Sequence, residues 1–313
     1  MIQILDKIVT DQNLAWDNKL QNKIEKFYVK ITDAAIDELL ENKMNFEENY
    51  ENLIILKNEI KEFKKILVSG CGFFVINNSC FSNFSEDEKK SIFSIICKIL
   101  GTLYVQNIKN EKYVVITDEG KSMKTGGRYH QTKEGGSFHT DSPQWTKTPD
   151  YIAMLCLHPA KAGGTSKFLS AYSIHNQMFK ENRILLEQLY NKFHFDKRNE
   201  FKENESPTVF EPIFKYENKN LTLRYLRNYI DKGHEIQKQN LTKIQIESLD
   251  LLDKISHNDD ISVNYDLKSD DMVFFNNNRV LHGRTSFEDH EDPNQKRYLI
   301  RAWIKDTNES ELN

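Results

Sequence analysis

The most informative run of this sequence is Gly136-Ser137-Phe138-His139-Thr140-Asp141-Ser142. Successive side chains of a β-strand point to opposite faces, so in an extended run His139 and Asp141 share one face. A second histidine lies far along the chain, in Phe274-Phe275-Asn276-Asn277-Asn278-Arg279-Val280-Leu281-His282-Gly283-Arg284. Two imidazoles and one carboxylate can hold one face of a six-coordinate Fe(II) and leave other positions open. We therefore predict that His139, Asp141 and His282 are metal ligands.

The His139/Asp141 spacing is a weak signal by itself, because a chain with nine histidines can contain it by accident. The prediction of a metal site is stronger because other characteristic residues follow in a defined order along the chain. A Gly163-Gly164-Thr165 turn follows it, and Arg297 and Arg301 follow His282. Residues four apart in a strand share a face, so both guanidinium groups can point into one cavity. Arginine suits a carboxylate ligand because its planar fork donates two parallel hydrogen bonds.

Composition and charge indicate an ordinary globular chain. Of its 313 residues, 38% are hydrophobic and 29% are charged, which allows a core in one large or two small domains. The net charge of −4, with mixed signs, gives no indication of a nucleic-acid or membrane partner. There is no signal-peptide pattern and no apolar run approaching the ~18 residues of a membrane span. Four cysteines without disulfide or zinc spacing are expected to be reduced, which favours a cytoplasmic protein.

The order of predicted elements indicates a mainly β fold with added helices. Helices are expected at 31–40, 46–65, 85–100, 173–190 and 242–255. Strands are expected at 66–68, 72–76, 103–105, 113–116, 151–157, 167–169, 209–210, 213–216, 221–225, 261–265, 272–275 and 297–304. Short strands separated by turns predict a double-stranded β-helix, that is, a jelly-roll or cupin-like barrel. We expect a single domain, 1–313, with a helical bracing segment at 1–65 and a jelly-roll catalytic core with helical insertions at 66–305.

These motifs, in this order, resemble a known family. The His139-Thr140-Asp141 run, the Gly-Gly-Thr165 turn, the His282 motif ending at Phe287, and Arg297 are similar to those of the TauD/TfdA superfamily of Fe(II)- and 2-oxoglutarate-dependent oxygenases. The His282 motif leans toward the branch that contains clavaminate synthase, arginine hydroxylases and γ-butyrobetaine hydroxylase. The resemblance covers roughly residues 66–305.

The resemblance implies roles for the matching residues. His139, Asp141 and His282 would ligate iron, Arg297 would bind the distal carboxylate of 2-oxoglutarate, and Thr165 would add a hydrogen bond to it. The loop 288–294 holds a few more residues before Arg297 than the family pattern has. With O2 as the other reactant, the implied reaction hydroxylates or desaturates an unactivated C–H and releases succinate and CO2. The carboxylate at Asp141 favours hydroxylation over halogenation, because halogenating relatives carry a small residue there.

The prime substrate is expected to be a small polar metabolite, such as an amino acid or related acid. The candidate substrate-binding residues are Arg301, Gln106, Asn107 and Arg224. Arg224 and Arg227 could contact an acidic substrate, but a position on a solvated strand face is equally compatible with the sequence. Several other polar residues are expected to be structural: His130, His158, His175 and Arg284, the last as a salt bridge that braces the site. Trp145 is compatible either with a pocket wall or with simple packing.

Two other functions compete with an oxygenase. A non-catalytic metal-binding cupin, acting as a sensor or binding protein, would need the metal ligands but not Arg297 and Thr165. A zinc hydrolase would use three ligands and an activated water and would not need the paired arginines. The sequence does not indicate the position oxidised, the pathway or the oligomeric state.

Overall fold

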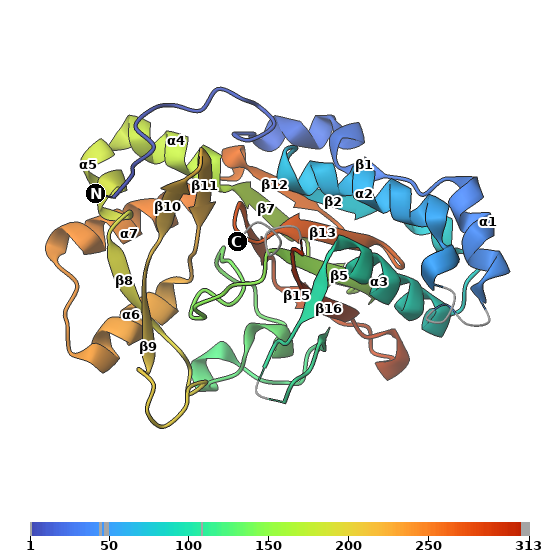
Figure 1. Ribbon diagram of the computed structural model, residues 1–313. Helices are drawn as coiled ribbons and strands as arrows, with labels where there is room; N and C mark the ends of the chain where they lie inside the picture. The colour runs from blue at the N-terminus through green and yellow to red at the C-terminus, as the bar shows by residue number, and fades with distance from the viewer. Residues whose placement is uncertain (1, 44–45, 47–49, 108, 308–313) are drawn as a thin grey trace.

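The computed structural model describes residues 2–43, 46, 50–107 and 109–307. Two facing sheets form its centre (Figure 1). The larger has the order β1-β2-β13-β5-β16-β3, with β4 also paired to β16, and the smaller has the order β12-β7-β14. Their strands are β1 (Tyr28–Val29), β2 (Phe73–Ile76), β3 (Thr102–Tyr104), β4 (Tyr113–Ile116), β5 (Tyr151–His158), β7 (Ser166–Ser170), β12 (Ser262–Tyr265), β13 (Met272–Asn276), β14 (Val280–Arg284) and β16 (Tyr298–Lys305).

Alternating side chains divide the hydrophobic residues of the large sheet between two cores. Phe73 and Val75 of β2 face the space between the sheets, where they pack with Phe168 of β7. Phe74 and Ile76 face the other way and pack against three helices on the outer face. These helices are α1 (Asp33–Glu41), α2 (Ile54–Val68) and α3 (Glu86–Leu100). The pairing is antiparallel apart from β1 with β2, and it confirms the predicted double-stranded β-helix core.

A second group of helices and hairpins covers the small sheet, at the other end of the molecule from α1–α3 (Figure 1). It shares a third hydrophobic core that includes Leu169 of β7 and Leu281 of β14. Its helices are α4 (Ala171–Glu181), α5 (Arg183–Gln188), α6 (Arg227–Gln237) and α7 (Lys243–Ser256). The remaining strands are β6 (Ala162–Gly163), β8 (Lys192–Asp196), β9 (Thr208–Pro212), β10 (Phe214–Glu217), β11 (Asn220–Leu223) and β15 (Phe287–Glu288). Among the described residues, no helix combines the length and apolar character needed to cross a membrane.

Several predicted boundaries are wrong for identifiable reasons. Residues 66–68 are the last turn of α2 and not a strand. The predicted helix 173–190 breaks at Asn182, which ends α4 and whose side chain caps α5. Part of the predicted helix 46–65, residues 47–49, lies outside the described residues, and the described part of the helix begins at Ile54. The helix after Ser85 is confirmed, with a complete capping box to Glu88. The division into segments 1–65 and 66–305 stays a prediction.

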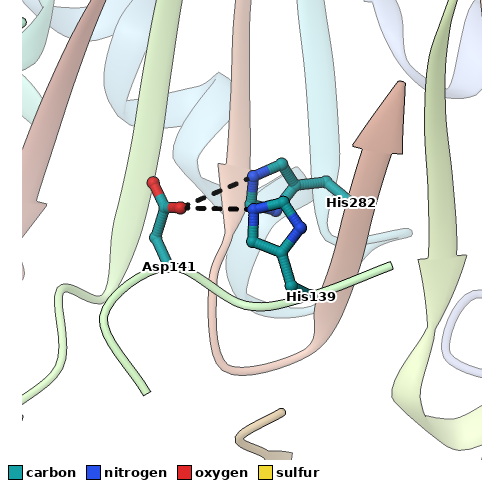
Figure 2. Close-up of side chains that lie close together, drawn as sticks. All are labelled: His139, Asp141 and His282. Carbon is teal, nitrogen blue, oxygen red and sulfur yellow. Dashed lines mark ion pairs between the residues drawn. The ribbon is translucent and has the colours of Figure 1, made fainter. Parts of the chain in front are cut away.

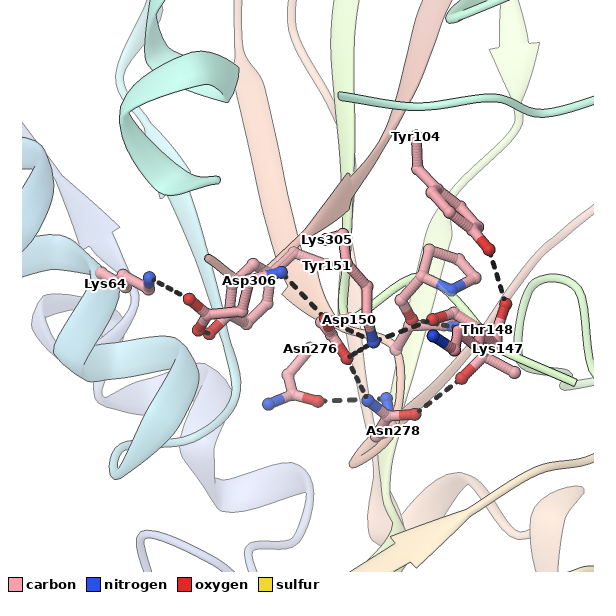
Figure 3. A network of polar contacts seen from close by, with 12 residues as sticks. Lys64, Tyr104, Lys147, Thr148, Asp150, Tyr151, Asn276, Asn278, Lys305 and Asp306 are labelled. Carbon is pink, nitrogen blue, oxygen red and sulfur yellow. Dashed lines mark hydrogen bonds and ion pairs between the residues drawn. The ribbon is translucent and has the colours of Figure 1, made fainter. Parts of the chain in front are cut away.

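A polar network joins the end of β16 to the start of β5 and to α2 (Figure 3). The Asp150 carboxylate accepts hydrogen bonds from the Lys305 Nζ at 2.9 Å, the Asp306 backbone N–H at 2.9 Å and the Asn278 side-chain amide at 3.2 Å. Asp306 in turn pairs with Lys64 of α2 at 2.7 Å. These partly buried contacts tie together the adjacent ends of two interior strands of the large sheet, β5 and β16.

Replacing Asp150 with alanine should therefore destabilise the fold. The change leaves three donors without their acceptor, and an unsatisfied buried group costs about 1–3 kcal/mol. We expect a lower midpoint of urea unfolding with an unchanged slope. Lys215→Ala is a suitable control, because it removes a charged contact to Glu217 whose two partners are more than half exposed. An Asp150→Ala variant as stable as the parent would show that the network contributes nothing to folding.

Candidate metal centre

Two histidines and one aspartate converge in the structure (Figure 2). The Nε2 atoms of His139 and His282 each lie 3.7 Å from Oδ1 of Asp141, and the ligand atoms of all three lie within 4.8 Å of one another. His282 is on β14. His139 lies outside any strand, but it forms a single bridge with His282 through reciprocal backbone hydrogen bonds of 3.0 and 2.9 Å. The predicted extended strand through 139–141 is thus reduced to one bridge, although the side chains still meet.

Asn277 holds the backbone that carries Asp141. Its side-chain Oδ1 accepts the Asp141 N–H at 2.7 Å, and its Nδ2 donates to the Asp141 carbonyl at 3.0 Å. Thr140 is fixed by two bonds with the Tyr225 backbone, one from its N–H and one to its hydroxyl. These contacts explain why an irregular segment presents its ligand in one orientation. Sequence analysis missed this role of Asn277, although the residue stands in the quoted His282 motif.

The protonation states suit a cation at the centre. The His139 Nδ1 lies 3.0 Å from the Ser137 carbonyl, so Nδ1 carries the proton and Nε2 presents a lone pair to Asp141. Burial lowers the pKa of both histidines, and the neighbouring His139 helps to bring that of His282 to about 3. Burial alone would raise the pKa of Asp141, but Arg301, the two histidines and the Trp303 indole bring it to about 2. Two neutral imidazoles and a carboxylate therefore meet without a shared proton, an arrangement that a divalent metal ion fits.

One carboxylate oxygen of Asp141, Oδ2, is already bonded to two neighbouring side chains. This oxygen accepts a hydrogen bond from the Trp303 indole N–H at 2.8 Å and an ion pair from Arg301 at 3.0 Å. Gln106 completes this brace, because its Oε1 accepts the Arg301 Nε–H at 2.8 Å and its Nε2 donates to the Arg301 carbonyl. Only Oδ1 is left for the metal. Arg301 and Gln106 were predicted to bind substrate, and both line the cavity. In the structure, however, the Arg301 guanidinium is bonded to Asp141 and the Gln106 amide is bonded to Arg301.

Arg297 has the properties expected of an anion anchor. It is only 5% exposed, its Nη1 has no hydrogen-bond partner among the described residues, and its guanidinium lies 5.0 Å from the Phe287 ring centre. Burial, with Arg284 nearby, lowers the pKa of Arg297 to about 10, so it stays charged at neutral pH. It lines the same cavity of about 340 Å³ as the three metal ligands and Arg301. A buried, incompletely paired guanidinium is costly unless an anion binds it, so a carboxylate ligand fits here.

The structure favours Ser166 over the predicted Thr165 as the hydroxyl beside this anchor. The Thr165 hydroxyl donates to the Asp266 carboxylate at 2.6 Å, and Thr165 lines a second pocket, to which Arg297 also contributes but the metal ligands do not. Ser166, the first residue of β7, lines the cavity that contains the metal ligands and Arg297. Neighbouring residues at the start of a strand point to opposite sides, so Ser166 is the candidate hydroxyl on the side of Arg297 that faces the metal ligands. The predicted role of Thr165 stays a prediction.

The other two predicted substrate residues are also engaged elsewhere. Asn107 lines the cavity, but its Oδ1 accepts the N–H groups of Lys109 and Glu111 and so closes a turn. Arg224 is absent from the cavity lining and donates to the carbonyls of Pro143 at 3.0 Å and Trp145 at 2.8 Å. It clamps the segment that follows Asp141.

Among the residues expected to be structural, Arg284 is a brace, but through carbonyls and not a salt bridge. Its guanidinium donates to the carbonyls of Tyr129 and Thr132 and lies 4.8 Å from the Tyr129 and Phe287 rings. His130 lines the cavity, where burial and then Arg301 lower its pKa to about 4. The others pack as expected: His175 against the Leu5 carbonyl and His158 beside Tyr298. Trp145 packs against Tyr104 and Trp303.

Comparisons with known proteins agree with this geometry. The curated FR-33289 synthase of Streptomyces rubellomurinus (strain ATCC 31215) is 28% identical over 319 aligned positions, covering 97% of this chain and 92% of the relative. An asparagine oxygenase solved with Fe(II), 2S,3S-3-hydroxyasparagine and succinate superposes with a TM-score of 0.69 at 14% identity, covering 89% of this chain and 93% of its own. The non-heme iron oxygenase OrfP, solved with Fe and alpha-ketoglutaric acid, gives 0.65 at 14% identity, with 91% and 96% covered. These two structural likenesses bear on the fold.

The family assignment comes from a profile match that spans most of the chain. The model described as "Taurine catabolism dioxygenase TauD, TfdA family" matches residues 40–303. This range contains the small sheet and the large sheet except for β1 and the last two residues of β16. It also contains the three converging side chains and the cavity residues Arg297 and Arg301. The chain belongs to the TauD/TfdA family of dioxygenases.

Proposed function

We propose that this protein is an Fe(II)- and 2-oxoglutarate-dependent dioxygenase that hydroxylates, or desaturates, an unactivated C–H of a small polar metabolite such as an amino acid or related acid. The observation that carries the proposal is that His139, Asp141, His282 and Arg297 line one cavity, and that the Arg297 Nη1 has no hydrogen-bond partner among the described residues. The asparagine oxygenase and OrfP, solved with hydroxyasparagine and hydroxyarginine, support an amino acid or related acid as the substrate class.

Each residue has a separate task in the proposed reaction. The metal and 2-oxoglutarate, when bound, supply the oxidising chemistry that removes hydrogen from the substrate. His139, Asp141 and His282 hold the metal on one face, and Trp303 with Arg301 keeps Asp141 to a single ligating oxygen. Arg297 and Ser166 bind the distal carboxylate of 2-oxoglutarate. Because the anchor is buried, little water competes for this carboxylate.

The test combines binding with turnover. Purified protein is titrated anaerobically with Fe(II) and 2-oxoglutarate while the iron–keto-acid absorption band is followed, and succinate is then measured with O2 and a substrate panel. An oxygenase shows both the band and substrate-stimulated succinate. A sensor of the cupin type binds metal but forms no succinate, and a zinc hydrolase turns over without 2-oxoglutarate. Either result would replace the proposal.

Ser166 and Thr165 offer a matched pair of variants. A neutral hydrogen bond contributes about 0.5–1.5 kcal/mol, so Ser166→Ala should raise the Michaelis constant for 2-oxoglutarate by roughly two- to tenfold. Thr165→Ala removes a hydroxyl bonded to Asp266 and should leave this constant nearly unchanged. The measurement is succinate formation against 2-oxoglutarate concentration. The reverse pattern would restore Thr165 as the cosubstrate residue.

A further inference from the structure

Part of the cavity wall lies beyond the groups assigned to metal and cosubstrate. It comes from three separate segments: the loop between β8 and β9, the first turn of α6, and the residues directly after Asp141. Its polar lining residues are Ser142, Gln144, Arg198, Glu200 and Asn228. Because none of these holds the metal, they are available to recognise the prime substrate.

The positively charged side chain of this wall is Arg198, and it differs from the neighbouring arginines in its contacts. Arg128 pairs with Glu200, which is also bonded by the Trp145 indole at 3.2 Å, so the Glu200 charge is already neutralised. Arg301 is likewise paired with Asp141. The Arg198 guanidinium has no carboxylate or carbonyl partner in the described part of the chain and lies 5.5 Å from the Tyr229 ring centre. It is therefore a charge available for a ligand.

The net charge of the cavity lining is positive, which also favours an anionic ligand. The described lining contains five arginines, Arg128, Arg198, Arg284, Arg297 and Arg301, against three carboxylates, Glu134, Asp141 and Glu200. The whole chain, in contrast, has a net charge of −4. Iron and 2-oxoglutarate bring opposite charges of equal size and leave this excess unchanged. A concave site of one sign concentrates ligands of the other.

Unsatisfied polar groups lie on the same wall. Ser142 and Gln144 are each only 6% exposed, and the Ser142 Oγ and Gln144 Oε1 have no hydrogen-bond partner in the described residues. A hydroxyl can donate, and the two ends of an amide can exchange by rotation, so both side chains can offer N–H or O–H groups. They follow Asp141 directly, which places the ligand they would bind close to the metal centre.

The start of α6 adds further donors. Its N-cap residue, Leu226, provides no side-chain cap, and Leu226, Asn228 and Tyr229 line the cavity. The Tyr229 N–H already donates to the Leu226 carbonyl at 3.1 Å, which leaves the N–H groups of Arg227 and Asn228 without a partner among the described residues. The N-terminal end of a helix also carries partial positive charge. Uncapped amides beside Arg198 favour an anion.

We propose that the prime substrate carries an acidic oxyanion group, bound by Arg198 together with Gln144 and the first turn of α6. The group is a carboxylate or a tetrahedral phosphonate or sulfonate, which share this donor chemistry. A guanidinium or ammonium group is disfavoured at this wall, because its one carboxylate among the described residues, Glu200, is already paired with Arg128. The inference rests on the proposed function, since the group is what would place a C–H beside the metal.

The probes are inorganic phosphate and acetate, titrated into the anaerobic protein already loaded with Fe(II) and 2-oxoglutarate. Binding is followed by calorimetry, and the iron–keto-acid band is recorded in the same samples. We expect at least one anion to bind with the band retained, and guanidinium chloride to show no binding. Tighter binding of phosphate indicates a tetrahedral group, and tighter binding of acetate a carboxylate. Failure of both anions, or loss of the band as they displace 2-oxoglutarate, would overturn the inference.

Variants locate the bound anion. Arg198→Gln should weaken anion binding by about ten- to a hundredfold, as expected for a lost charge-assisted hydrogen bond, while Arg198→Lys should retain part of it. Arg183→Gln removes the same charge at an exposed site paired with Asp6 and Glu187, and should have no effect. Equal anion affinity in Arg198→Gln and the parent would refute the assignment. A missing iron–keto-acid band in the parent would instead refute the proposed function.

Discussion

Alanine in place of His139, Asp141 or His282 is expected to abolish iron binding and 2-oxoglutarate-dependent turnover. Each change removes one of three donor atoms that lie within 4.8 Å of one another. Loss of a residue that only orients a ligand typically costs ten- to a hundredfold in metal affinity, so loss of a ligand itself should cost more than about a hundredfold. Iron content after anaerobic loading, and succinate release, measure the two effects.

The three variants should differ in stability. His139→Ala and His282→Ala remove neutral imidazoles and leave no charge behind. Asp141→Ala leaves Arg301 and the Trp303 indole without their acceptor, so its melting temperature should fall the most. His158→Ala, at the end of β5 beside Tyr298, is the control and should retain iron. Stoichiometric iron in all three variants would show that the metal binds elsewhere.

The approach of His139 to Asp141 could be predicted from sequence because their spacing is local, whereas the position of His282 depends on the fold. The role of the three residues as metal ligands stays a prediction. An imidazole and a carboxylate two residues apart meet on one side of any extended segment, whether it is a strand or, as here, a single bridge. The central strands were also predictable, because runs such as Phe73–Ile76 are buried on both faces and β-branched or aromatic residues dominate them.

The rest of the fold depends on contacts that no local pattern encodes. Helix α6 was missed because Leu226 gives no cap and Gly233 interrupts the helix pattern. Gly233 is there for packing, since a Cβ would lie 2.3 Å from the His194 carbonyl oxygen of β8. The β8–β9 hairpin on which α6 packs was only partly predicted, because a strand was expected at the position of β9 but not at that of β8. Because the sequence did not predict that the β8–β9 hairpin packs against α6, it could not place Arg198 and Asn228 in the cavity.

The roles of the cavity arginines illustrate a similar limit. The sequence predicted that Arg297 and Arg301 share a cavity, and both line it. It did not predict which would be free, because that depends on Asp141 and Gln106, which are distant in sequence. The Arg297 Nη1 has no partner among the described residues, so Arg297 can bind the cosubstrate. Arg301 is instead bonded to Asp141 and orients that carboxylate.

Arg297→Ala should weaken 2-oxoglutarate binding by roughly ten- to over a hundredfold. A charge-assisted hydrogen bond contributes about 1.5–3 kcal/mol, and 1.4 kcal/mol is a factor of ten in affinity. The Michaelis constant of the prime substrate should change far less. Arg297→Lys should recover part of the loss, because lysine keeps the charge but not the planar fork. Anaerobic titration of the iron–keto-acid band reports the affinity directly.

Arg301→Ala is the matched comparison, because it removes the same kind of side chain four residues further along the chain, on β16, which begins directly after Arg297. Its guanidinium is paired with Asp141, so the variant should bind iron more weakly, and 2-oxoglutarate normally once iron is saturating. Unchanged 2-oxoglutarate affinity in Arg297→Ala, with a large loss in Arg301→Ala at saturating iron, would exchange the two roles. The brace on Asp141 would then have to open when 2-oxoglutarate binds, and Trp303 alone would hold the Asp141 Oδ2.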